Sequence, residues 1–362
     1  MFRLKNLQAV RLYAALSVVL VHLLPLYGHS APFGHSGVDV FFVLSGFLMA
    51  MISESDPGAF LRRRLIRIIP AYWLCTLGIF VIALACPRLL HTTGANAWNL
   101  LKSLCFVPYR KESGLIQPML NLGWTLNYEL FFYGIFALIL WLKLPRPGLI
   151  VALIVSAFAA TGLLLQPQSD LLQFYTSPIV MDFVLGIAAF QFFASFRNGM
   201  DGVWSLTLLL GLVLALPFLE ICGGLGRRIF FMGAPAAAIL VLAAQLDSRN
   251  FSVNQRWVLL AGDASYLLYL THLYVFQLGE KLIPIKPGWS LVARAGLGVS
   301  LVALALLVAI TLHLWFELPL LEYLKSRLLP ENAGKRQPFP APAADAPATS
   351  LNCTSLNSQT KA

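Results

Sequence analysis

The stretch RLYAALSVVLVHLL, residues 11–24, is apolar enough to enter a membrane, yet it begins with an arginine and contains a histidine. Similar apolar runs recur along the 362-residue chain, of which 58% is hydrophobic and only 12% charged. Soluble domains carry about twice that share of charged residues. The composition therefore predicts an all-α, polytopic transmembrane helix bundle.

About ten apolar segments are long enough to cross the hydrocarbon core of a bilayer. They cover residues 12–28, 38–53, 70–86, 122–142, 147–166, 177–195, 203–221, 229–246, 257–278 and 291–316. When the N-terminus is placed in the cytoplasm, most of the 26 lysines and arginines fall on the cytoplasmic side. We therefore expect both termini to be cytoplasmic.

The chain divides into one membrane domain over 1–329 and a tail over 330–362 that is rich in Pro, Ala, Ser and Thr. Such a tail lacks the apolar residues needed for a core, so we expect it to be disordered. The loop at about 87–121 mixes aromatic, polar, Pro and Gly residues, and we expect an ordered outer cap. The basic residues form no single patch and the cysteines have no metal-site spacing, so neither a nucleic-acid partner nor a metal is expected.

The first two long apolar segments contain ionisable residues, which usually face the interior of a bundle. Arg11 and His22 lie eleven positions apart, about three helical turns, so they share one helix face. A neutral histidine can accept a proton from a hydroxyl group, or it can simply link two helices by a hydrogen bond. Asp39 begins the second segment and either orients the imidazole ring of His22 or caps its own loop.

Two later segments also carry a polar face. Glu129 and Tyr133 are one turn apart, with Trp124 at the membrane interface, and Tyr269 shares a face with His272. Glu129 is expected either to contact a substrate hydroxyl or to form a structural ion pair. The polar groups expected to cluster in the outer half of the membrane are His22, Asp39, Glu129 and His272.

A run of arginines precedes the third segment, in FLRRRLIRIIPAYWL, residues 60–74. Arg64 and Arg67 are three positions apart, so their guanidinium groups can share a face and bind phosphate oxygens. The alternative is an ordinary topology signal or a contact with lipid headgroups. Glu317, near the end of the last segment, is expected to pair with this cluster.

With these motifs the chain resembles the acyltransferase-3 family of integral membrane acyltransferases. Beyond the Arg11 and His22 pair, the likeness lies in GVDVFFVLSGFL (37–48), RLIRIIPAYW (64–73), GWTLNYELFFY (123–133), SYLLYLTH (265–272) and FELP (316–319). These motifs occur in order from residue 11 to about 320. One departure is Leu12, which stands where the family commonly has glycine.

The resemblance implies transfer of an acyl group, commonly acetyl, from cytoplasmic acyl-CoA to a sugar hydroxyl of an exopolysaccharide, O-antigen or related glycolipid. It implies a catalytic role for His22, and Asp39 and Glu129 are the carboxylates expected to assist it. The residues expected to bind the donor are Arg11, Arg64 and Arg67. The residues expected to bind the acceptor are Trp124, Tyr133, Tyr269 and His272.

The expected location is the inner membrane of a bacterium, in contact with lipids, a saccharide acceptor and possible polysaccharide-assembly proteins. Two other classes fit the apolar segments. Ten helices with intramembrane histidines also fit a transporter or flippase for an acyl group or glycolipid, which would cleave no thioester. A non-catalytic assembly subunit would leave the buried polar residues without a function.

Overall fold

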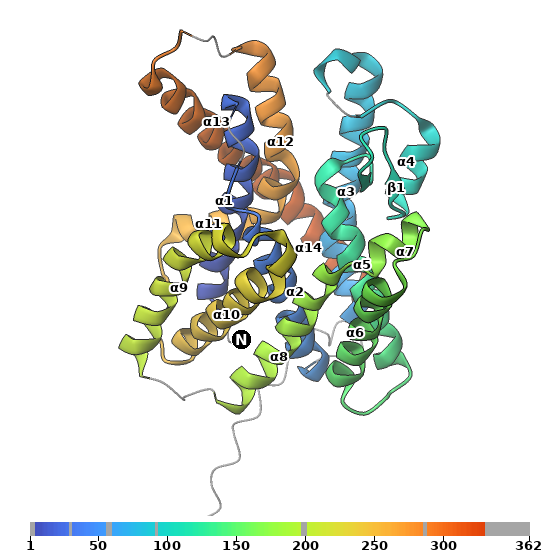
Figure 1. The fold of residues 1–362 in the computed structure, drawn as a ribbon, viewed down its shortest axis with the longest axis vertical. Helices are drawn as coiled ribbons and strands as arrows, with labels where there is room; N and C mark the ends of the chain where they lie inside the picture. Colours follow the sequence, from blue (N-terminus) through green and yellow to red (C-terminus); the bar gives the residue numbers. More distant parts are fainter. Residues whose placement is uncertain are drawn as a thin grey trace, which may run out of the picture.

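The computed structural model describes residues 4–28, 31–55, 60–90, 93–196, 201–284 and 288–329 as a bundle of helices (Figure 1). The predicted tail, 330–362, lies outside these residues. The α-helices are α1 (Asn6–Leu23), α2 (Ser36–Ser55), α3 (Phe60–Ala85), α4 (Ala97–Leu104), α5 (Trp124–Trp141), α6 (Pro147–Leu165), α7 (Asp170–Tyr175), α8 (Met181–Ser195), α9 (Gly202–Gly223), α10 (Ala234–Ser248), α11 (Arg256–Asp263), α12 (Ser265–Leu282), α13 (Leu291–Leu312) and α14 (Leu318–Leu328).

The predicted number of membrane spans is confirmed. Within the described ranges, nine helical segments are long and apolar enough to cross a membrane, and a bent pair of helices brings the number to as many as ten. Each of the segments expected from the sequence has a counterpart among them. The last one is longer than expected, because α13 continues through a π-helical turn, His313–Glu317, into α14.

The bent pair differs from the single span predicted over 257–278. Helix α11 meets α12 at an angle of 70°. A Cβ atom on Gly262 would lie 2.4 Å from the carbonyl oxygen of Gln8, so only glycine permits α11 to pack this closely across α1. The short α11 is therefore held against the start of α1, and α12 turns away to run beside the remainder of α1.

Helix α2 lies at the centre of the bundle, since 83% of its span is buried, against 11% for the peripheral α9. It makes its closest contact with α8 through two glycines. An added Cβ would lie 2.2 Å from the Phe183 carbonyl oxygen at Gly46 and 2.1 Å from the Val43 carbonyl oxygen at Gly186. Gly37 similarly packs α2 against α1. Gly37 and Gly46 thus allow α2 to approach α1 and α8 closely.

The loop after α3 forms the ordered cap that the sequence predicted, as far as its residues are described. It contains α4 and an antiparallel hairpin of β1 (Tyr109–Arg110) and β2 (Ile116–Gln117), which lie beside α3 in Figure 1. Lys111 is buried within it and donates to the Met119 carbonyl oxygen, 3.2 Å away, and to the Asn121 side chain. Burial lowers the pKa of Lys111 to about 8.

Candidate active site

Two histidines meet where α1 packs beside α12. His22 comes from the last turn of α1 and His272 from the middle of α12. Their ring centroids are 5.1 Å apart, and the Nε2 atom of His272 lies 3.2 Å from the Nδ1 atom of His22. His272 is completely buried and His22 is partly buried. His22 and His272, which were expected to cluster, therefore do lie together.

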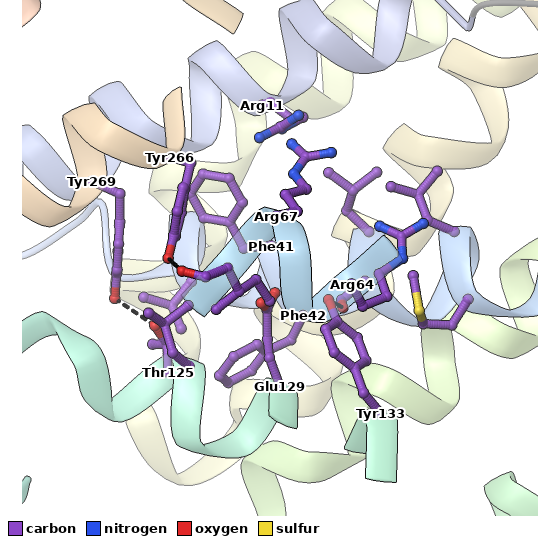
Figure 2. Close-up of a pocket in the computed structure, with 17 residues that line it drawn as sticks. Arg11, Phe41, Phe42, Arg64, Arg67, Thr125, Glu129, Tyr133, Tyr266 and Tyr269 are labelled. Atoms are coloured by element: carbon purple, nitrogen blue, oxygen red, sulfur yellow. Dashed lines mark hydrogen bonds between the residues drawn. The ribbon is translucent and has the colours of Figure 1, made fainter. Parts of the chain in front are cut away.

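Three arginines line a pocket that includes Tyr269 but neither of the two histidines. Arg11 comes from α1, whereas Arg64 and Arg67 come from α3. Figure 2 shows the guanidinium groups of Arg11 and Arg67 close together, with Arg64 above Tyr133. The α1 and α3 arginines thus share one pocket although they are distant in sequence. Three guanidinium groups around one space provide the donors that a phosphate group requires.

The carboxylate of Glu129 points into the same pocket (Figure 2). Glu129 was expected to lie with the histidines in the outer half, but its neighbours are the arginines. Burying a carboxylate is costly unless cations lie nearby. Helix α5 accordingly presents Glu129 to the arginines of α1 and α3. Glu129 therefore partly balances the positive charge of the pocket.

Hydroxyl groups form the remainder of the polar lining. Thr125 donates to the Tyr269 hydroxyl at 3.1 Å, and the hydroxyls of Ser45 and Tyr133 are 2.9 Å apart. Tyr266, which was not among the expected site residues, lines the pocket and donates to the Ile68 carbonyl oxygen at 2.9 Å. These bonds fix the side chains around the arginines.

Tyr269 connects the pocket to the histidine pair. It lines the pocket, and its ring centroid is 6.3 Å from that of His272, one turn further along α12. Phe41, also in the lining, packs edge-on against Tyr269. The arginine pocket and the histidines are therefore adjacent, with one layer of aromatic side chains between them.

Trp124 lies outside the pocket lining and packs within the aromatic core. Its ring is edge-on to Phe42 and to Tyr128, with centroids 6.2 Å and 5.9 Å away. An acceptor-binding role for Trp124 stays a prediction. Glu317 accepts a 2.7 Å bond from Nδ1 of His313 and also lines a small hollow together with Arg67.

Two roles were expected for Asp39, orienting His22 or ordering its own loop, and the structure favours the second, because the carboxylate of Asp39 is paired with Arg228. Asp39 is completely buried and forms a two-pronged ion pair with Arg228, with N–O distances of 2.6 and 2.7 Å. Arg228 also donates to the His35 carbonyl oxygen at 3.2 Å. Arg228 lies 189 positions after Asp39, in a short turn that contains Gly and Arg residues. This turn resembles an ordinary loop, so the sequence gives no sign of the ion pair. Asp39 therefore fixes the start of α2 against the turn that precedes α10.

Replacing Arg228 by alanine is expected to lower the free energy of unfolding by about 3–5 kcal/mol, because it leaves a buried carboxylate without its partner. The measurement is the thermal unfolding midpoint of the detergent-solubilised protein, compared with Arg227→Ala. Arg227 is the exposed neighbour of Arg228, so its loss should change the midpoint little. Equal midpoints for the two variants would contradict a stabilising ion pair.

These features define a multi-pass membrane protein whose interior holds a cationic pocket beside two histidines. The model of the acyltransferase domain that defines the acyltransferase-3 family matches residues 4–314, and the chain belongs to this family. The resemblance inferred from the motifs is thereby confirmed, and the protein is an acyltransferase of groups other than aminoacyl groups.

Named relatives support this assignment. The chain is 34% identical to the exopolysaccharide production protein ExoZ of Rhizobium meliloti (strain 1021), covering 85% of this chain and 96% of the relative. It is 28% identical to the acyltransferase MdmB of Streptomyces mycarofaciens, covering 95% and 96%. A shorter match, 32% identical over 37% of this chain and 23% of the relative, is to the putative peptidoglycan O-acetyltransferase YrhL of Bacillus subtilis (strain 168). No solved structure matches the chain.

Proposed function

We propose that the protein transfers an acyl group, acetyl in the simplest case, from acyl-CoA to a sugar hydroxyl of an exopolysaccharide, O-antigen or lipid-linked saccharide. The reaction takes place in the inner membrane of a bacterium. The observation that carries the proposal is the adjacency of the arginine pocket and the histidine pair across Tyr269. A relative named for exopolysaccharide production, similar over nearly its whole length, supports a saccharide acceptor.

The donor half of the proposal rests on Arg11, Arg64 and Arg67. Guanidinium groups bind phosphate oxygens through two parallel N–H bonds, and CoA carries phosphates at one end and the thioester at the other. With both termini in the cytoplasm, as the charge distribution predicts, the arginines of α3 face the compartment that contains acyl-CoA. The long pantetheine arm then brings the thioester past Tyr269 toward the histidines.

The chemical step is assigned to His22. Its Nε2 atom removes the proton from the sugar hydroxyl while the hydroxyl oxygen attacks the thioester carbonyl carbon. The tetrahedral intermediate collapses, the C–S bond breaks, and the CoA thiolate leaves and takes the proton back from His22. The products are the O-acyl sugar and free CoA, so the step balances in atoms and electrons without a further reactant.

The test is the acyl content of the host's surface polysaccharide, measured by proton NMR in a deletion strain. Complementation with the wild-type gene is expected to restore an O-acyl signal that the deletion removes. An unchanged set of O-acyl signals in the deletion strain would reject a surface saccharide as the acceptor.

A further inference from the structure

We propose that His272 is a positioning residue that, together with the Val18 carbonyl oxygen, holds the ring proton of His22 on Nδ1 and so leaves Nε2 as the free base. This inference rests on the proposed function, because it explains how His22 becomes a base. It also supplies the orienting group that Asp39, paired with Arg228, does not provide.

The tautomer of His272 follows from its contact with its own helix. Its Nδ1 atom lies 2.8 Å from the Leu268 carbonyl oxygen, which only accepts hydrogen bonds, so Nδ1 carries the ring proton. His272 is completely buried, and an unpaired charge there would be costly, so the ring is neutral and has only this proton. Its Nε2 atom is therefore a lone-pair acceptor.

That acceptor faces His22. The Nδ1 atom of His22 lies 3.2 Å from Nε2 of His272 and 2.9 Å from the Val18 carbonyl oxygen. Both partners accept, so the ring proton of His22 must be on Nδ1. The other tautomer would place the Nδ1 lone pair against two further lone pairs. The remaining nitrogen of His22, Nε2, holds a lone pair that is free to remove a proton.

The same contact assists the reaction after proton transfer. When Nε2 of His22 takes the hydroxyl proton, the imidazolium ring donates its Nδ1 proton more strongly to His272 and to Val18. In a Ser-His-Asp triad a carboxylate performs this task. Here a neutral imidazole performs it, which avoids burying a carboxylate beside His22 in the membrane.

The two amide variants of His272 separate this role from packing. The side-chain amide of asparagine reaches the position of Nδ1 and can bond Leu268, but it stops short of His22. The longer glutamine places an amide oxygen near the position of Nε2 and can accept from His22. Both variants are polar and similar in cost of burial, so their turnover can be compared per mole of folded protein at matched membrane abundance.

The assay uses inside-out membrane vesicles and [14C]acetyl-CoA, and it follows label transferred to the endogenous saccharide. For His272→Asn we expect kcat to fall about 100-fold, which is the lower end of the contribution of a general base. We expect its KM for acetyl-CoA to stay within about threefold of wild type. For His272→Gln we expect kcat within about tenfold of wild type. A wild-type kcat for His272→Asn, or equal losses in both variants, would overturn the positioning role.

His22→Ala distinguishes the failure of this inference from the failure of the proposed function. Loss of transfer in His22→Ala together with normal kcat in His272→Asn would reject only the role of His272. Normal transfer in His22→Ala would reject His22 as the base, and the role of His272 with it.

Discussion

His22→Ala is expected to lower acyl transfer by about 10²–10⁴-fold, because the alanine variant lacks the nitrogen that removes the hydroxyl proton. The loss should appear in kcat, since the arginines proposed to bind the donor are unchanged. The measurement is the rate of [14C]acetyl transfer to saccharide in inside-out vesicles that contain equal amounts of wild-type or variant protein.

The matched control is Leu20→Ala, in the same helix and two positions away. Leu20 is 41% exposed at the surface of the bundle, so its truncation leaves the histidine pair intact. The control should transfer acetyl at the wild-type rate. Full activity in His22→Ala would show that the histidine only links α1 to α12.

The second large effect is expected from the double substitution Arg64→Ala, Arg67→Ala. Each hydrogen bond between a guanidinium and a phosphate contributes about 1.5–3 kcal/mol, which corresponds to a factor of about 10–100. The double variant should therefore raise KM for acetyl-CoA at least about 100-fold. The measurement is the dependence of the vesicle transfer rate on acetyl-CoA concentration.

Arg62→Ala serves as the matched control for the arginine variant. Arg62 belongs to the same run but is exposed outside the pocket, so removing it changes the local charge without changing the lining. Its KM for acetyl-CoA should remain within about threefold of wild type. Equal increases of KM in Arg62→Ala and in the double variant would indicate a general effect of charge and not a donor site.

The spans could be predicted from sequence because length and hydropathy alone determine which segments can cross a bilayer. That His22 and His272 lie together could also be predicted, since helical rise places a residue along the membrane normal once the end of its span is known. The break before α12 could not be predicted, because it depends on the contact of Gly262 with Gln8 in another helix.

The partners of the buried carboxylates could not be predicted from the sequence. Helical spacing shows which residues share a face, but it does not show which helix that face meets. Asp39 therefore seemed available to His22 until the structure placed Arg228 against it. The arginine neighbours of Glu129 could not be predicted either, because helical spacing does not show which helices the face of α5 meets. Tyr266 had a usable signal, since its spacing of three from Tyr269 in SYLLYLTH places both on one side of α12.

The most direct test of the central claim is whether one thioester is cleaved for each acyl group that reaches the saccharide. Inside-out vesicles receive [14C]acetyl-CoA, and free CoA and labelled saccharide are measured together. The proposed reaction predicts that the two products appear in equal amounts and that both disappear in vesicles lacking the protein. Movement of saccharide or acyl label across the membrane without release of free CoA would instead indicate a transporter and contradict the account.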